Sequence, residues 1–250
     1  HMSQDNCLAL SQFNVVIVGN GAIGSALLEN LLQRQSLHRA VVLGRSTHNA
    51  SDDKRVTYVT FDAEDAESVL NAATRVKESL DRVHLLINTV GLLHNQHQGP
   101  EKQLKTLNPE HLQKAFQVNA MLLPLLAQAF SKLLRHDDPV VLASLSARVG
   151  SIEDNQLGGW YSYRASKAAH NMLLKTIANE WRISHRNAIV VALHPGTVYS
   201  RLSEPFVSER YKNRVLTPAE CASSLLTVIG DLQLEDSGNF YDWQGKSIPW

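Results

Sequence analysis

Short apolar runs alternate along the chain with longer segments in which apolar residues recur every three or four positions. Runs rich in valine, isoleucine and leucine predict β-strands, whereas the longer spacing predicts helices with one buried face. The predicted strands cover about residues 13–18, 40–44, 56–61, 83–88, 139–144, 188–194 and 239–242. The predicted helices cover about residues 22–35, 65–80, 109–135, 160–184 and 217–230.

Several predicted strands are apolar throughout rather than alternately apolar and polar. The runs VVIVG, VVLG and HLLIN are typical of strands that helices cover on both faces of a sheet. This alternation of strands and helices predicts an α/β fold, a Rossmann-type doubly wound parallel sheet in a three-layer αβα arrangement. No linker or repeat divides the sequence, so we expect a single domain over residues 13–250. Residues 1–12 would form an N-terminal tail, in which His1 and Met2 resemble a tag remnant.

Composition and charge narrow the classes of partner. The 250 residues are 44% hydrophobic, as in a globular protein, and Lys+Arg and Asp+Glu both number 24, so no net field favours nucleic acid or an anionic membrane. The two cysteines, Cys7 and Cys221, fit a reducing compartment. There is no signal-peptide pattern and no apolar run of about 20 residues that would span a bilayer. We therefore expect a soluble, cytoplasmic protein.

A glycine-rich turn follows the first predicted strand and leads into the first predicted helix. Its sequence, GNGAIG, places glycines at Gly19, Gly21 and Gly24. Such glycines allow a tight turn and let the backbone approach a pyrophosphate, whose charge the free N–H groups of the helix start would bind. This position in the chain favours dinucleotide binding over an ordinary glycine-capped turn.

The residues after the second predicted strand bear on the choice of dinucleotide. Gly44 is followed by Arg45 and Ser46, and the acidic residue that binds a free ribose 2'-hydroxyl is missing. An arginine can instead pair with a 2'-phosphate, although a solvated arginine is a common alternative. The sequence thus favours NADP(H), with NAD(H) also possible.

Polar residues follow nearly every predicted strand, at the edge where open α/β sheets bind ligands. Asp62, Asn88 with Gly91, Ser144 with Ser146, and His194 with Pro195 and Gly196 occupy these positions. As a series they predict a shared ligand crevice.

The stretch YSYRASK contains one tyrosine that can share a helix face with the lysine. Lys167 lies four residues after Tyr163, whereas Tyr161 is six before it and lies off that line. An ammonium about 5 Å away would lower the pKa of a phenol by roughly two units, making it a usable acid or base. A tyrosine and lysine on a solvated helix face is the alternative for this spacing taken alone.

Together these motifs resemble those of the short-chain dehydrogenase/reductase family. The resemblance runs from VVIVGNGAIG through INTVG, FQVNA, LASLSARVGSI and YSYRASK to HPGTV. The stretches SARVGSI and GGWYSYRASKAAHNM, with the closing FYDWQGKSIPW, are most similar to the subgroup of C-factor signalling proteins and related carbonyl reductases.

The resemblance implies a role for each matching residue. Tyr163 would be the general acid/base, Lys167 would lower its pKa and bind the nicotinamide ribose, and Asn119 would hold a water in the proton relay. Ser146 would polarise the substrate carbonyl, with Ser144 as the second candidate, more simply explained as a satisfied polar residue at the strand end. The implied cofactor-binding residues are Gly19, Asn20, Gly21, Ile23, Gly24, Arg45, Ser46, Asp62, Asn88, Gly91, Tyr163, Lys167, Pro195, Gly196, Val198 and Ser200.

The chain departs from the family pattern at the dinucleotide site. Val18 replaces the usual threonine before the glycine loop, the loop is one residue shorter, and Ala22 stands at the middle glycine. The usual Asn-Asn-Ala-Gly reads Asn88-Thr89-Val90-Gly91, and Ser200 takes the position of a threonine that holds the carboxamide.

The predicted function is NADP(H)-dependent hydride transfer between nicotinamide and a small carbonyl or alcohol, in a homodimer or homotetramer. A dinucleotide-binding signalling protein with little turnover is the alternative. A metal site at His94 and His97 lacks a nearby carboxylate or cysteine, and the strained Gly-x-Ser-x-Gly elbow of a serine hydrolase is missing, so neither of these functions is favoured.

Overall fold

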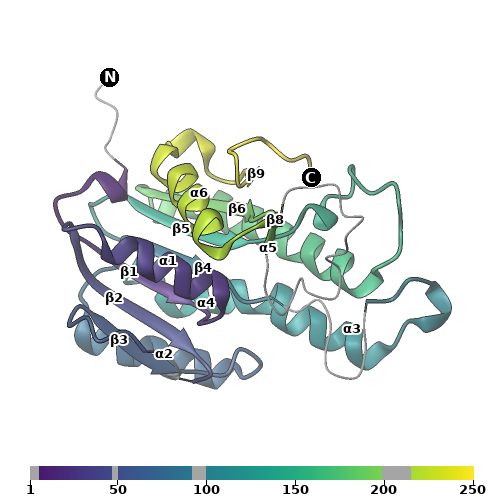
Figure 1. Cartoon of the computed structure of the whole chain (residues 1–250), viewed down its shortest axis with the longest axis horizontal. Coiled ribbons are helices and arrows are strands. Elements are labelled where there is room, and N and C mark those ends of the chain that lie inside the picture. Colours follow the sequence, from purple (N-terminus) through teal and green to yellow (C-terminus); the bar gives the residue numbers. More distant parts are fainter. Residues whose placement is uncertain (1–5, 47–49, 92–99, 199–214) are drawn as a thin grey trace.

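A twisted sheet of seven parallel strands forms the centre of the computed structural model, which describes residues 6–46, 50–91, 100–198 and 215–250 (Figure 1). The strand order is β3-β2-β1-β4-β5-β6-β9. The order reverses between β1 and β4, and in open α/β sheets ligands bind beyond the carboxyl ends of the strands at such a switch point. The predicted Rossmann-type fold is confirmed.

The seven predicted strands all occur in this sheet. Their bounds are β1 Phe13–Val18, β2 Leu37–Gly44, β3 Val56–Thr60, β4 Leu85–Asn88, β5 Val140–Leu145, β6 Ala188–His194 and β9 Phe240–Asp242. The helices are α1 Ala22–Leu32, α2 Ala66–Ser79, α3 Pro109–Phe116, α4 Leu122–Phe130, α5 Tyr161–Ser184 and α6 Pro218–Asp231. Two short strands, β7 Thr197–Val198 and β8 Val215–Leu216, pair with each other outside the main sheet.

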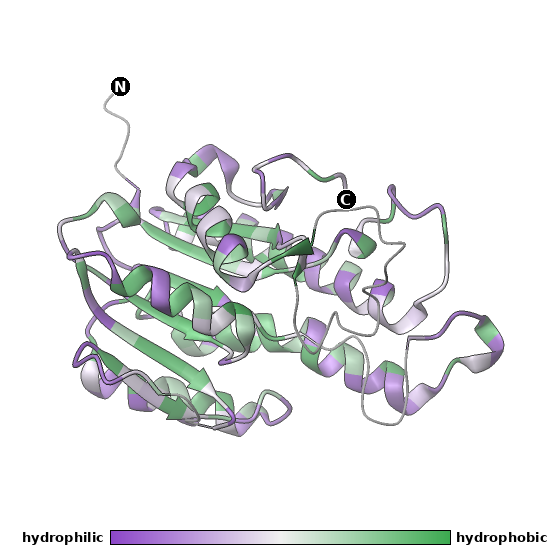
Figure 2. Ribbon diagram, viewed as in Figure 1, coloured by the Kyte–Doolittle hydropathy of each residue, from purple (hydrophilic) through white to green (hydrophobic). Residues whose placement is uncertain are grey.

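Helices cover both faces of the sheet, which explains the uniformly apolar strands. Successive strand side chains point to opposite faces, so Val16 and Val18 pack against α2, α4 and α5, while Val15 and Ile17 pack against α1 and α6. Figure 2 shows the strands of the sheet as mostly apolar and the helices as bands of apolar and polar residues in alternation. Burying apolar surface on both faces is worth about 25 cal/mol per Å² and is the main force holding the layers together.

The helix predicted over 109–135 is interrupted. It divides into α3, a π-helical turn at Gln117–Met121 and α4, which ends at Phe130. A π-turn accommodates one extra residue in a helix, and the apolar spacing on either side still looks helical, so periodicity did not reveal it.

The segment just before β1 packs on the domain. Cys7 and Leu8 are buried against α6, and the Asn6 side chain donates to the carbonyl oxygens of Ile229 at 2.8 Å and Leu232 at 3.1 Å. Residues from Asn6 onwards, which the sequence places in the tail, are therefore part of the packed structure.

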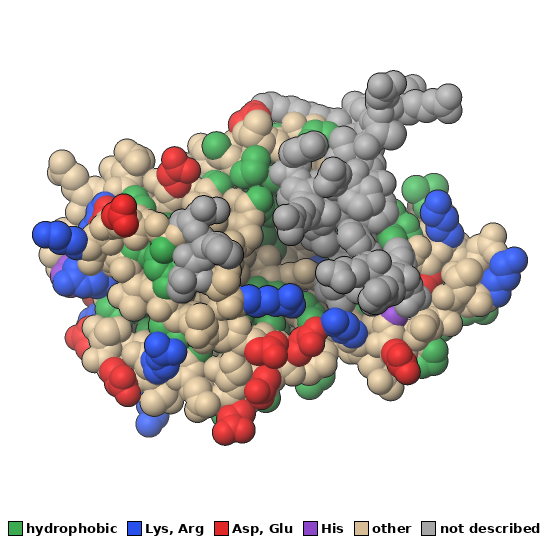
Figure 3. Space-filling model, turned by 60° about the horizontal axis from the view of Figure 1, so that its bottom comes forward, with side chains coloured by type: hydrophobic (Ala, Val, Ile, Leu, Met, Phe, Trp, Pro, Cys, Tyr) green, Lys and Arg blue, Asp and Glu red, His purple; other side chains and the backbone are tan. Residues whose placement is uncertain are grey.

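Charged side chains of both signs occur on the face shown in Figure 3, in keeping with the equal numbers of acidic and basic residues. Within the described ranges, no helix combines the length and the apolar character that crossing a bilayer requires.

Candidate active site

Three glycines occur around the start of α1 and have different surroundings: Gly19 and Gly21 lie between β1 and α1, and Gly24 lies in the first turn of α1. A Cβ atom on Gly24 would lie 2.0 Å from the carbonyl oxygen of Gly19, and Gly19 has a φ of +108°. A Cβ on Gly21 would meet nothing within 4 Å. Gly19 therefore makes the tight turn, Gly24 allows helix α1 to pack on it, and Gly21 leaves backbone open at the helix start. This is the arrangement that a pyrophosphate needs, so the residues present fit a dinucleotide.

Asn20 links this turn to the end of β2. Its Nδ2 donates to the carbonyl oxygen of Ser46 at 3.3 Å, and its Oδ1 accepts from Ser25 Oγ at 3.2 Å. Gly44 makes room for it, because a Cβ there would lie 2.8 Å from Asn20 Cβ. The turn thus holds Arg45 and Ser46 beside it, both exposed at the end of β2.

The residues after β3 and β4 are held mainly by internal hydrogen bonds. Asp62 is exposed, and its Oδ1 accepts from Glu64 N at 2.9 Å. Asn88 is buried, donating to Ser144 Oγ at 3.1 Å and accepting from Val90 N at 3.2 Å. The Asn88 side chain therefore braces β4 against β5.

The remaining predicted cofactor residues lie near the carboxyl ends of the strands. Ile23 is half-buried against the α1 side of the core, and Val198 is buried in β7. Gly196 has a φ of +79°, and a Cβ there would lie 2.8 Å from the Trp243 ring, so the turn after Pro195 needs glycine. Ser200, His94 and His97 lie outside the described residues.

Helix α5 carries Tyr163 and Lys167 to the carboxyl end of β5. Lys167 is buried, and its Nζ donates to the carbonyl oxygen of Leu145 at 3.2 Å. A Cβ on Gly91 would lie 3.5 Å from Lys167 Nζ and 3.7 Å from Asn119 Oδ1, so these three predicted site residues meet. Tyr163 is half-buried on the same helix, whereas Tyr161 is 40% exposed.

Burial moves both pKa values toward the neutral forms. It raises the pKa of Tyr163 to about 12 and lowers the pKa of Lys167 to about 8. In this arrangement the lost solvation of the phenolate dominates the pKa of Tyr163, and the Lys167 ammonium donates to the Leu145 carbonyl oxygen. That Lys167 lowers the pKa of Tyr163 stays a prediction. A phenol that keeps its proton at neutral pH suits a proton donor to a carbonyl oxygen.

Asn119 lies on the π-turn, a feature that often occurs at functional sites. It is buried, and its Nδ2 donates to Ser166 Oγ at 3.0 Å; Ser166 Oγ in turn donates to the carbonyl oxygen of Tyr163 at 3.1 Å. The π-turn therefore joins the α3–α4 layer to the first turns of α5.

Both serines after β5 are buried and hydrogen-bonded. Ser144 Oγ accepts from Asn88 and contacts His170 Nε2 at 2.7 Å, as expected for a satisfied polar residue at a strand end. Ser146 Oγ donates to Asn171 Oδ1 at 2.6 Å. The tight packing of the next loop requires Gly150, where a Cβ would lie 2.9 Å from Lys167 Cβ.

Three residues near the site were missed from the sequence. His170 and Asn171 follow Lys167 on α5 and contact the two serines. Glu101 is buried and accepts from Ser162 N at 3.2 Å and from the Ser162 hydroxyl, at the start of α5. None of the three belongs to a spacing pattern, and Glu101 meets its partner across 61 residues of chain.

A cluster of His84, His136 and Asp138 gathers at the opposite end of β4 and β5. His84 Nδ1 accepts from Asn14 N at 2.9 Å, and His136 Nδ1 accepts from Asp138 N at 3.2 Å. Their other ring nitrogens then carry protons toward Asp138 Oδ2 and the Val83 carbonyl oxygen. With both lone pairs occupied, this cluster braces the sheet and leaves no ligand atom on either histidine for a metal.

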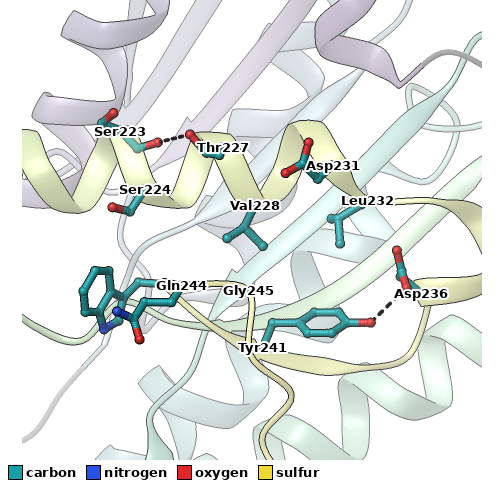
Figure 4. Close-up of a pocket in the computed structure, with 11 residues that line it drawn as sticks. Ser223, Ser224, Thr227, Val228, Asp231, Leu232, Asp236, Tyr241, Gln244 and Gly245 are labelled. Atoms are coloured by element: carbon teal, nitrogen blue, oxygen red, sulfur yellow. Dashed lines mark hydrogen bonds between the residues drawn. The ribbon is translucent and has the colours of Figure 1, made fainter.

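A hollow between α6 and the segment around β9 shares no residue with the predicted site (Figure 4). Its polar groups are partly bonded to each other: Tyr241 OH donates to Asp236 Oδ1 at 3.0 Å, and Thr227 Oγ1 donates to the Ser223 carbonyl oxygen at 2.9 Å.

Comparison with known proteins gives consistent results. The family model for short chain dehydrogenases matches residues 14–210. C-signal of Myxococcus xanthus is 30% identical over 168 residues, which cover 67% of this chain and 93% of that protein. The 1-hydroxy-2-glutathionyl-2-methyl-3-butene dehydrogenase of Rhodococcus sp. (strain AD45) is 29% identical over 189 residues, covering 76% and 78%. The NADPH-bound carbonyl reductase from chicken fatty liver superposes with a TM-score of 0.84 at 26% identity, covering 96% of this chain and 100% of that one.

Proposed function

Because the chain belongs to the short-chain dehydrogenase family and is an oxidoreductase of that family, we propose that it catalyses NADP(H)-dependent interconversion of a small carbonyl compound and its alcohol. The observation that supports this proposal best is the attachment of α5 to the end of β5. Lys167 bonds to Leu145 and Ser146 bonds to Asn171, which ties α5 to the carboxyl end of β5, two strands from the glycine turn after β1.

In this proposal the open backbone at Gly21, with Arg45 and Ser46, would hold the dinucleotide, and Lys167 would bind the nicotinamide ribose. When bound, the nicotinamide supplies or accepts the hydride. Ser146 donates a hydrogen bond to the substrate carbonyl oxygen, and Tyr163 gives that oxygen its proton. Asn119 holds the relay that returns a proton to Tyr163 through Lys167.

We propose NADP(H) as the preferred cofactor because of Arg45. Within the described part of the chain its exposed guanidinium makes no ion pair, and residues 40–50 contain no Asp or Glu that would repel a 2'-phosphate. The NADPH-bound carbonyl reductase of similar fold supports this choice. The free thiols of Cys7 and Cys221 support a cytoplasmic location.

A signalling role without turnover is the less favoured alternative. The 30% identity to C-signal motivates it. A protein that only bound a dinucleotide would have no use for Ser146, Tyr163 and Lys167 held together at one strand end.

The test is to follow nicotinamide absorbance while the protein is incubated with NADPH or NADH and a panel of aldehydes, ketones and alcohols. We expect oxidation of NADPH with at least one carbonyl compound, abolished by Tyr163→Phe. Dinucleotide binding without turnover on the whole panel would favour the signalling alternative.

A further inference from the structure

Five buried side chains form one hydrogen-bonded chain beneath the proposed site. It runs from Asn88 to Ser144, His170, Asn171 and Ser146, over distances of 3.1, 2.7, 3.0 and 2.6 Å. Each of the five is at most 4% exposed. The last link occupies Ser146, whose single proton is given to Asn171 Oδ1.

This arrangement leaves two groups without a hydrogen bond that they need. Asn171 Nδ2 is buried without a hydrogen-bond partner, although buried amide donors are nearly always paired. Ser146 has no proton left for a substrate, although the proposed reaction requires it to donate to a carbonyl oxygen.

Rotating the Asn171 side-chain amide by half a turn removes both problems, the unpaired Nδ2 and the occupied Ser146 proton. It exchanges Oδ1 and Nδ2, and the two protons of an amide nitrogen point in nearly the same directions as the two lone pairs of the oxygen. Nδ2 would then donate to Ser146 Oγ and to His170 Nδ1, and the Ser146 proton would be released. The unpaired amide group of Asn171 becomes a carbonyl oxygen, which proteins tolerate better than an unpaired N–H. In exchange, Ser144 Oγ accepts from both Asn88 Nδ2 and His170 Nε2, so the Ser144 proton turns away from His170.

The protonation of His170 is coupled to this choice. His170 is 1% exposed and is repelled by the nearby Lys167, and its pKa is lowered to about 3, so the ring is neutral and carries one proton. If Asn171 presents oxygen, the proton must be on Nδ1; if it presents nitrogen, Nδ1 must be bare and Nε2 must donate to Ser144 Oγ. The histidine tautomer and the amide orientation therefore fix each other.

We propose that Asn171 is a positioning residue that donates to Ser146 Oγ, held in that orientation by the Nε2–H tautomer of His170, so that Ser146 keeps its proton for the substrate. This inference rests on the proposed function, since it assigns a donor role to Ser146. It names no new contact with the dinucleotide.

The tautomer is measured directly by two-bond ¹H–¹⁵N correlation spectra of the ¹⁵N-labelled full chain with NADP⁺ added. His170 signals are identified by their loss in His170→Gln. We expect the Nε2–H pattern, and an Nδ1–H pattern would overturn the proposal. This readout needs no turnover, so it separates failure of the inference from failure of the proposed function.

The kinetic test uses Asn171→Asp, because a carboxylate of the same shape can only accept. We expect kcat/KM to fall at least tenfold, with NADPH affinity within twofold of the unmodified protein. Asn108→Asp is the matched control: Asn108 is exposed and its Oδ1 accepts from Glu110 N at 2.9 Å, which an aspartate also does.

A merely structural role is excluded by a double-mutant cycle with Ser146→Ala. If Asn171 acts through Ser146, Asn171→Asp causes no further loss in the Ser146→Ala background. Independent losses, or an Asn171→Asp variant within threefold of the unmodified protein, would overturn the proposal. If Asn171→Asp does not fold, the tautomer of the unmodified protein decides.

Discussion

Tyr161 and Tyr163 differ in chemistry because they differ in surroundings. Tyr161 is 40% exposed on the outer side of α5, while Tyr163 is half-buried near the end of β5 and its pKa is raised to about 12 by burial. A phenol that holds its proton at neutral pH suits the general-acid role proposed for Tyr163. Substituting Tyr163 therefore tests the catalytic assignment, and the same substitution at Tyr161, two positions away, is its control.

Tyr163→Phe should lower kcat for carbonyl reduction at least ~100-fold, the lower range for removing one general acid. NADPH affinity should change little, because the phenyl ring keeps the shape of the site. Absorbance assays and fluorescence titration give the two quantities. Tyr161→Phe should be nearly silent, and equal losses from the two substitutions would remove the assignment.

Arg45→Ala should weaken NADPH binding at least tenfold and leave NADH almost unchanged. A hydrogen bond to a charged group is worth about 1.5–3 kcal/mol, or roughly ten- to a hundredfold in affinity. Isothermal titration with both dinucleotides measures this. Arg39→Ala, an exposed arginine of the same strand β2, is the control. Equal or tighter binding of NADH by the unmodified protein would contradict the cofactor assignment.

At the scale of the element, the start of α5 depends on a turn that precedes the helix and on an acceptor from a distant part of the chain. Gly158, Gly159 and Trp160 all have positive φ, and Arg164 holds this turn through the carbonyl oxygens of Gly159 at 3.0 Å and Gly158 at 3.1 Å. Glu101 supplies the acceptor for Ser162 that the N-cap residue does not. Its negative charge at a helix N-terminus is favourable.

Glu101→Ala should lower the free energy of unfolding by about 1–3 kcal/mol, because it leaves buried donors of Ser162 without their acceptor. Glu101→Gln should lose less, since its amide oxygen can still accept. Chemical denaturation measures both changes. Glu110→Ala, an exposed carboxylate in the first turn of α3, is the control. A Glu101→Ala change within about 0.5 kcal/mol of zero, the neutral range for surface sites, would contradict the capping role.

The sequence predicts the elements more fully than their interruptions. Buried parallel strands are apolar on both sides, so β1, β2 and β4 were visible as continuous runs. The π-turn at Asn119 was not, because one extra residue in 109–135 leaves a helical spacing on each side.

The same limit applies to the candidate site. Gly21, Arg45, Tyr163 and Lys167 lie in motifs with a recognisable spacing, so the sequence could nominate them. The contacts of Asn171 with Ser146 and of Glu101 with Ser162 form only when the layers pack, and the pKa of Tyr163 depends on burial that no local pattern shows.

At the scale of the whole molecule, the outer face of α5 presents apolar side chains to solvent. Tyr161, Met172 and Ile183 are 40%, 68% and 79% exposed and follow one another at eleven-residue intervals, about three helical turns. The small residues Ala165 and Ala168 lie on the same line, between the first two of these side chains, and allow a close approach. Such a self-complementary stripe suits a two-fold symmetric partner.

We expect a homodimer or homotetramer in which α5 packs against its symmetry mate. Met172→Glu should shift the protein toward a smaller species, because it would bury like charges near the two-fold axis. Light scattering at micromolar concentration gives the mass. Leu70→Glu, on the exposed side of α2, should not change it. A monomeric unmodified protein would contradict the expectation.

Substitution of Gly21 would separate the presence of the folded protein in a cell from its enzymatic activity. A Cβ atom there would meet nothing within 4 Å, whereas one on Gly24 would clash with the backbone of Gly19. A variant with a bulky residue at position 21 should accumulate to normal levels but fail to bind dinucleotide. A variant with a bulky residue at position 24 should misfold and be degraded. Comparing the two strains with a deletion would tell a geneticist whether the cell needs the reaction or only the folded protein.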